Sequence, residues 1–268
     1  MRVRLAPGVA PERAIETINE IAGNRAAATP PGVPLPSTQR MNYVRWATNA
    51  EAQLVSVLHR DDARAFFDSP RHRDICSMLP DDHVITLINA EVDGTAHALR
   101  ETSAYLQGQL SRLRAGPGCP VIVDSNVLLQ CQRLDNVAWR PQLKDEARLM
   151  VPLRVMEELD AKKYGDSKRL RGIARELLPW IDSLFPDAAP GPVPLRADAT
   201  IELVIAERPR YRPADADEEV LDLTHEVVRF VGAAKLMTAD TGMRIRARSE
   251  GLDVLYIPAE WRRSTGDD

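Results

Sequence analysis

An alternation of short apolar runs and helical stretches restricts the fold more than any other feature. It begins after the breaker sequence AGPGCP, residues 115–120. The apolar runs that predict strands are residues 121–123, 149–151, 201–206, 235–238 and 254–257. The stretches that predict helices between them are residues 155–161, 168–184, 217–231 and 242–249. Because strands alternate with helices, we expect an α/β domain with a parallel sheet covered by helices on both faces.

The residues before the breaker have helical spacing almost throughout. Apolar side chains recur at helical intervals over residues 11–22 and 41–58, and a long helix is expected over residues 82–114. Residues 29–37 contain Pro30, Pro31, Gly32, Pro34 and Pro36, which predict a linker. The chain is therefore predicted to contain an all-α N-terminal domain over residues 1–115 and an α/β domain over residues 120–262.

Leucines recur on one side of the long predicted helix, at Leu99, Leu106, Leu110 and Leu113. Packing inside a helical bundle explains such a stripe. The alternative hypothesis is a surface for a homodimer or another partner. The N-terminal part contains no recognisable catalytic pattern.

Composition excludes several classes of protein. With 44% hydrophobic and 28% charged residues, the chain is not expected to be disordered, and its net charge of -4 argues against non-specific coating of nucleic acid. Three cysteines without paired spacing predict a reducing, cytoplasmic setting. No signal peptide or apolar run long enough for a membrane span is expected, and the histidines lack zinc-site spacing.

Four acidic residues fall near the carboxyl ends of the predicted strands, where open α/β sheets bind ligands. Asp124 and Asp240 directly follow strands, Glu158 lies one helical turn after a strand, and Asp217 opens a helix. Taken singly, each has an ordinary explanation as a helix cap, a turn residue or part of a solvated helix face. Taken together, they predict one cleft in which a cation offsets their repulsion. All-oxygen, carboxylate-rich ligation favours Mg²⁺ or Mn²⁺.

The order of the motifs VIVDSNVLL, VPLRVMEELDAKK, DADEEVL and LMTADTGMRIRA resembles the PIN-domain nucleases, over about residues 120–261. This resemblance implies a three-layer fold with a central parallel sheet. It implies a catalytic and metal-binding set consisting of Asp124, Glu158, Asp217 and Asp240. Glu218 and Glu219 are alternative acids beside Asp217, and Ala239 and Thr241 stand where many members have a further acid or asparagine.

The resemblance also implies small polar residues around the metal, which here are Ser125 or Asn126 and Thr238. Basic residues that follow the motifs are candidates for contacts with the substrate backbone: Lys162, Lys163, Arg244 and Arg246. An ordinary solvated helix face is the alternative interpretation for each of them. The implied reaction is hydrolysis of RNA phosphodiester bonds by water that Mg²⁺ or Mn²⁺ activates, and single-stranded RNA is the expected substrate.

Two other functions stay open at this point. One is a catalytically weak module that retains the PIN fold and binds RNA or a protein. The other is a structure-specific DNA nuclease. The complete set of four acids favours an enzyme over a binding module, and no helical clamp or arch for DNA is evident in the sequence.

Overall fold

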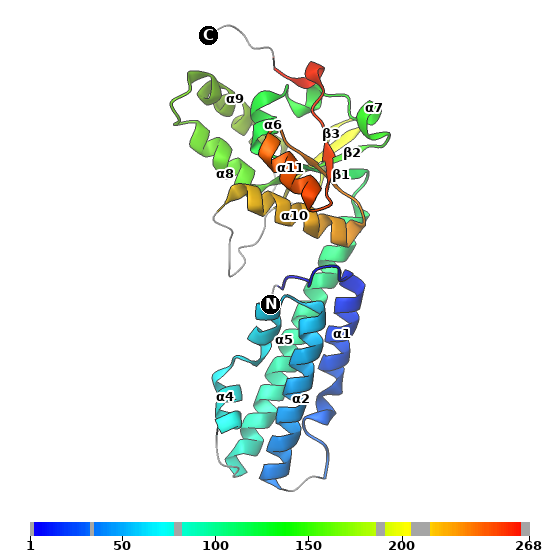
Figure 1. Ribbon diagram of the computed structural model, residues 1–268, viewed down its shortest axis with the longest axis vertical. Coiled ribbons are helices and arrows are strands. Elements are labelled where there is room, and N and C mark those ends of the chain that lie inside the picture. Colours follow the sequence, from blue (N-terminus) through cyan, green and yellow to red (C-terminus); the bar gives the residue numbers. More distant parts are fainter. Residues whose placement is uncertain (1–2, 33–34, 78–81, 186–190, 205–214, 264–268) are drawn as a thin grey trace. The chain divides into compact units, whose positions relative to one another are not determined.

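The computed structural model describes residues 3–32, 35–77, 82–185, 191–204 and 215–263. The chain forms two compact units, Met1–Ser111 and Arg112–Asp268. Figure 1 shows that the first unit consists of helices, whereas the second is built on a sheet. No helix in the described ranges is long and apolar enough to cross a membrane.

The first unit contains helices α1 to α4, two short 3-10 helices and most of α5. Their bounds are α1 Pro11–Gly23, η1 Asn24–Ala27, α2 Pro36–Val57, α3 Arg60–Arg64, η2 Ala65–Phe67, α4 Pro70–Ser77 and α5 Asp82–Ala115. Proline in the first turn begins both α1 and α2, since it lacks the N–H that this turn leaves unpaired. Because Pro36 starts α2, this helix begins five residues before the predicted one and includes the last two residues of the predicted linker.

Three of the four leucines in the predicted stripe are buried within the chain. Leu99, Leu106 and Leu113 are at most 3% exposed, and Leu110 is half-buried. Packing inside a single chain therefore accounts for the stripe. Self-association through these helices stays a prediction.

The second unit contains a six-stranded sheet in the order β3-β4-β2-β1-β5-β6. Its strands are β1 Cys119–Val123, β2 Ala147–Pro152, β3 Val193–Arg196, β4 Ala199–Val204, β5 Lys235–Met237 and β6 Asp253–Leu255. All neighbouring strands are parallel except β3 and β4. The predicted central parallel sheet is thus confirmed. The sequence did not predict β3, because Pro194 disfavours a strand, and an edge position with a register shift is where a sheet accepts proline.

Helices lie between most of these strands, and a short 3-10 helix follows β6. Their bounds are α6 Ser125–Gln130, η3 Leu134–Asn136, α7 Arg140–Leu143, α8 Leu153–Lys162, α9 Lys168–Leu184, α10 Ala216–Val231, α11 Thr241–Ser249 and η4 Ala259–Trp261. The chain moves from β1 through β2 to β4 in one direction along the sheet, and then returns past β1 to β5. The direction of winding therefore reverses between β1 and β5, and in open α/β sheets ligands bind at the carboxyl ends of strands at such a point.

A buried ion pair joins β2 to β4. Arg148 Nε lies 2.8 Å from Glu202 Oε1, and both side chains are at most 1% exposed. The two groups are in contact but not aligned for a hydrogen bond. Arg148 also donates to the carbonyl of Leu113 at 2.5 Å, and Arg112 lies 3.3 Å from Glu202. Gly116 leaves room for this arginine, because a Cβ there would overlap the guanidinium group.

Candidate active site

Asp124 lies where the direction of winding reverses. It directly follows β1 and occupies the N-cap position of α6. Its backbone N–H donates to the carbonyl of Met237 at 3.1 Å, which ties the end of β1 to the end of β5. The residue is 2% exposed, so its carboxylate requires compensating interactions.

Those interactions come from the three small polar residues that were predicted to surround the site. Thr238 Oγ1 donates to Asp124 Oδ2 at 2.8 Å, and Asn126 Nδ2 donates to the same oxygen at 3.2 Å. Ser125 Oγ donates to Oδ1 at a longer 3.4 Å. Thr238 also accepts from the backbone N–H of Asp240 at 3.0 Å. One buried hydroxyl therefore links the two aspartates that follow β1 and β5.

Asp240 begins α11 as its N-cap. Its Oδ1 accepts from the backbone N–H of Met243 at 2.7 Å. Among the described residues, its Oδ2 accepts no hydrogen bond. A Cβ on Gly242 would lie 3.2 Å from Asp240 Oδ1, a tight contact that would require the carboxylate to shift slightly. One oxygen of Asp240 thus stabilises the helix, and the other is not engaged.

Asp217 shows that the acidic residues interact. It lies in the first turn of α10, and its pKa is raised by partial burial and by repulsion from Asp124, Asp215, Asp240 and Glu158. All three other predicted acids are among the charges that act on it. Carboxylates from four separate segments of the chain therefore contribute to one negative field.

Of the two glutamates in the motif VPLRVMEELDAKK, Glu158 contributes its charge to this negative field. It lies on α8 and is half-buried. Its neighbour Glu157 is exposed and lies 3.4 Å from Arg154. One residue along a helix corresponds to about 100°, so the two glutamates project to different sides.

The donor chemistry fits a hard divalent cation. Carboxylate oxygens are the ligands that Mg²⁺ and Mn²⁺ prefer, and repulsion between these groups falls when a cation lies among them. Within the described ranges, no three acidic, histidine or cysteine side chains are already gathered tightly enough to hold one ion. The like charges disfavour such close approach on their own, and Asp240 is partly turned towards its helix. The four acids therefore suit a divalent cation by their chemistry and their location. Their side chains must rotate before they can bind one ion together.

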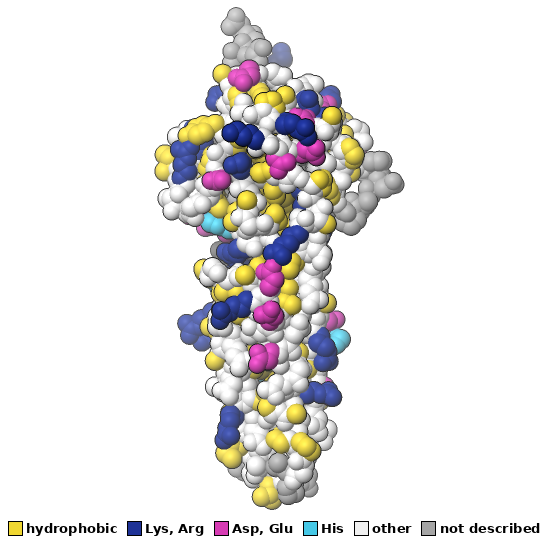
Figure 2. Space-filling view, turned by 90° about the vertical axis from the view of Figure 1, so that its right-hand side faces the viewer, with side chains coloured by type: hydrophobic (Ala, Val, Ile, Leu, Met, Phe, Trp, Pro, Cys, Tyr) yellow, Lys and Arg dark blue, Asp and Glu magenta, His cyan; other side chains and the backbone are white. Residues whose placement is uncertain are grey.

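The four predicted substrate-binding cations have different surroundings. Lys163 lies 2.8 Å from Asp160, and Arg244 donates to the carbonyl of Ala239 at 3.1 Å and to Thr241 Oγ1 at 2.8 Å. Among the described residues, Lys162 has no partner. On the face that Figure 2 presents, cationic and anionic side chains are interspersed, so no large field of one sign covers it.

Arg246 pairs with three carboxylates. It lies 3.9 Å from Asp215, 3.4 Å from Glu218 and 3.5 Å from Glu250. The first two belong to the start of α10, so Arg246 connects α11 to the helix that carries Asp217. In this conformation the charge of Arg246 is therefore paired with carboxylates of the protein itself.

Asp215 is a residue that the sequence interpretation missed. Its side chain accepts from the backbone N–H of Asp217 at 3.1 Å and caps α10, and its charge helps to raise the pKa of Asp217. A signal was present, since an aspartate three residues before Glu218 is a helix-capping pattern.

Comparison with known proteins identifies the second unit. Residues 121–257 match the family described as PIN domain. Among solved structures, one similar chain is a domain of a functionally unknown protein from Methanocaldococcus jannaschii DSM 2661. It is 18% identical, with 56% of this chain and 96% of that chain covered at a TM-score of 0.36, too low to support any argument. No curated protein matches the chain.

Proposed function

The chain belongs to the PIN-domain family, whose members are in general nucleases, and from this premise we propose that it is a metal-dependent ribonuclease. The observation that carries the proposal is the Thr238 hydroxyl that links Asp124 and Asp240 beyond the strand ends, where the charges of Asp124, Asp240 and Glu158 also act on Asp217. Concentrating negative charge in this way destabilises a scaffold, and it is useful where a cation is to be bound. This argues against a module that only binds RNA or protein.

Asp124 and Asp240 are the proposed direct ligands of Mg²⁺ or Mn²⁺, and Glu158 and Asp217 would bind the ion directly or through water. When bound, such an ion supplies a water molecule of lowered pKa and positive charge that stabilises the transition state of phosphodiester hydrolysis.

The protein's own groups orient the site. Thr238 and Asn126 fix the Asp124 carboxylate by donating to one of its oxygens, which leaves the other oxygen less constrained. Lys162 and Lys163 on α8, with Arg244 and Arg246 on α11, are the proposed contacts to the substrate backbone. Such contacts position a strand without reading its sequence. Single-stranded RNA in the cytoplasm is the proposed substrate, in keeping with three cysteines that form no disulfide.

Cleavage of labelled single-stranded RNA with Mn²⁺ tests this function. We expect the parent protein to cleave, EDTA to stop cleavage, and Asp124→Asn to lower the rate by more than about 100-fold, because removing a ligand costs more than removing its supporting hydrogen bond. Asp182→Asn, an exposed change on α9, is the matched control and should cleave like the parent.

Two outcomes would replace the proposal. A folded parent that binds RNA without cleaving it would be a binding module. Faster cleavage of flap DNA than of single-stranded RNA or single-stranded DNA in parallel reactions would identify a structure-specific DNA nuclease.

A further inference from the structure

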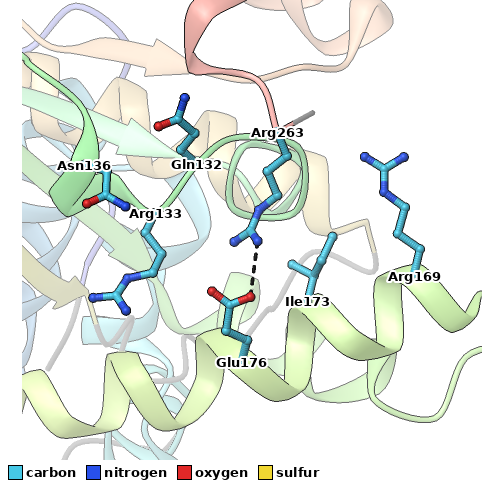
Figure 3. A pocket seen from close by; sticks show the side chains of 7 residues that line it. All are labelled: Gln132, Arg133, Asn136, Arg169, Ile173, Glu176 and Arg263. Carbon is cyan, nitrogen blue, oxygen red and sulfur yellow. Dashed lines mark hydrogen bonds and ion pairs between the residues drawn. The ribbon is translucent and has the colours of Figure 1, made fainter. Parts of the chain in front are cut away.

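A cavity of about 440 Å³ lies in the second unit, outside the carboxylate cluster. The residues that line it, drawn in Figure 3, are Gln132, Arg133, Asn136, Arg169, Ile173, Glu176 and Arg263. None of the four acids of the candidate active site is among them. Its volume is in the range of sites that hold small ligands.

Arginine dominates this lining, and Ile173 is its one apolar member. Arg169 is exposed and has no partner among the described residues. Arg263 donates from Nε to the carbonyl of Cys131 at 2.7 Å, whereas its Nη2 is buried and has no hydrogen-bond partner among the described residues. A buried donor without a partner costs free energy, and an oxyanion in the cavity would recover that cost once the guanidinium turns towards it.

The charges of the cavity do not cancel. Glu176 lies 3.3 Å from Arg263, and Asp135, outside the lining, pairs with Arg133. These two acids offset two of the three arginines, and the charge of Arg169 remains. The guanidinium of Arg133 also lies over the ring of Trp180, 4.6 Å from its centroid, which fixes its plane.

We propose that this cavity binds a phosphate group of the RNA strand, as a subsite separate from the catalytic cluster; the inference rests on the proposed function. Guanidinium groups offer paired donors that match phosphate oxygens. The side-chain amide of Asn136 has no partner among the described residues and adds a neutral donor. A carboxylate or an apolar ligand would use this donor set less well.

A short helix, α6, joins Asp124 to the segment that lines the cavity. Asp124 occupies the N-cap position of α6, and Gln132 follows that helix by two residues. Six helical residues span about 9 Å, which is roughly three steps of a stacked strand at about 3.4 Å each. A phosphate in the cavity would therefore belong to a nucleotide a few steps from the bond that is cleaved.

The test is RNA binding measured without catalysis. Fluorescence anisotropy of a 5′-hydroxyl single-stranded RNA in EDTA, over a range of salt concentrations, compares the parent with Arg169→Gln. We expect the variant to bind severalfold more weakly, by the same factor for unrelated sequences, and its slope of log affinity against log salt to be smaller by about 0.7. Arg175→Gln, an exposed change on α9 outside the cavity, should leave both quantities unchanged.

Equal affinity and slope for Arg169→Gln and Arg175→Gln would overturn the proposal, as would a parent that does not bind RNA. Asn136→Asp gives an independent test, since it places a negative charge in the cavity; it should also weaken binding, and unchanged binding would count against the subsite. A parent that binds with these effects but does not cleave would refute the nuclease function and leave the subsite standing. If the parent cleaves RNA but Arg169→Gln does not change RNA binding, the nuclease function stands and the subsite is refuted.

A second experiment, which compares RNA with and without a 5′-phosphate, identifies which phosphate of the strand the cavity binds. Equal binding of 5′-hydroxyl and 5′-phosphorylated RNA assigns the cavity to an internal phosphate. Tighter binding of the 5′-phosphorylated strand, lost in Arg169→Gln, assigns it to a strand end. If inorganic phosphate protects the protein against heating while Arg169→Gln leaves RNA affinity unchanged, the cavity takes free phosphate and the proposal fails.

Discussion

At the scale of single residues, Thr238 has the most constrained role near the acids. It is buried, and its hydroxyl both donates to Asp124 and accepts from the backbone of Asp240. Few side chains can do both, because the position requires one donor and one acceptor in a volume that also fits the end of β5. A residue without charge therefore sets the relative placement of two aspartates.

Thr238→Val should lower RNA cleavage by about 10- to 100-fold, since it removes the hydrogen bond that orients a ligand while keeping the side-chain shape. Initial rates with Mn²⁺ and the concentration of Mn²⁺ at half-maximal rate measure the effect. Thr224→Val is the matched control, because Thr224 is equally buried and its hydroxyl, among the residues that the structure describes, bonds only to the carbonyl of Val220 within α10. Equal rates for both variants would refute the role of Thr238.

Asp217 has a raised pKa, which makes its effect on stability depend on pH. Burial and neighbouring carboxylates disfavour its charged form in the folded protein. The folded state therefore holds its proton to a higher pH than the unfolded state does. Stability from this group is present below the ordinary aspartate range and is lost as pH rises through the raised pKa.

Asp217→Asn should consequently raise the Tm of the metal-free protein at pH 7, and this gain should shrink as the pH falls into the ordinary aspartate range. Thermal unfolding in EDTA at several pH values measures it. Asp182→Asn should show no such pH-dependent gain, because the residue is exposed on α9. A lower Tm for Asp217→Asn at pH 7 would mean that its charge is not repelled.

At the scale of elements, aspartates of the acidic cluster also occupy the N-cap positions of helices. Asp124 precedes α6, Asp215 precedes α10 and Asp240 precedes α11. A helix N-terminus favours a negative charge, so these positions reduce the cost of collecting acids. The same geometry makes capping and metal binding compete for the oxygens of Asp240.

Two substitutions of Asp240 separate these roles. Asn is as good a cap as Asp, and Asp240→Asn also removes a charge that repels Asp217, so this variant should be at least as stable as the parent in EDTA but lose cleavage. Asp240→Ala should lose cleavage and also about 1 kcal/mol of unfolding free energy, because the N–H of Met243 loses its acceptor. Urea unfolding measures the difference. Equal stability of the two variants would show that the cap contributes nothing.

At the scale of the whole molecule, the candidate site exists only in the folded chain. Its acids come from residues 124, 158, 217 and 240, and the switch between β1 and β5 brings them to one edge of the sheet. A cation that binds all of them binds the folded state and not the unfolded chain. Its binding free energy is therefore added to the stability of the fold.

Mn²⁺ should raise the Tm of the parent, and EDTA should reverse the rise. At 100 times its Kd the ion contributes about 2.7 kcal/mol, which corresponds to roughly 5–10 °C for a unit of this size. Differential scanning fluorimetry measures this shift, and Asp124→Asn should largely abolish it. An equal rise in parent and Asp124→Asn would place the ion elsewhere.

The sequence by itself determined the α/β class, the parallel sheet and the order of its elements, because burial on both faces imposes continuous apolar runs whose ends are visible in the chain. It also located Asp124 and Asp240 beside strand ends. It could not find β3, where proline at an edge contradicts local propensity, and it placed the start of α2 too late because the first turn of that helix lacks an apolar pattern.

Tertiary structure alone decided the relations that depend on distance. It paired Arg246 with three carboxylates, joined Thr238 to Asp124, and brought Arg133, Arg169 and Arg263 to one open cavity. The physical reason is that charges and hydrogen bonds act across a few ångströms of space, whereas the residues that make them are separated by up to 130 positions of sequence (Arg133 to Arg263). Hydrophobic periodicity predicts which side of an element is buried. It does not predict which polar groups contact each other.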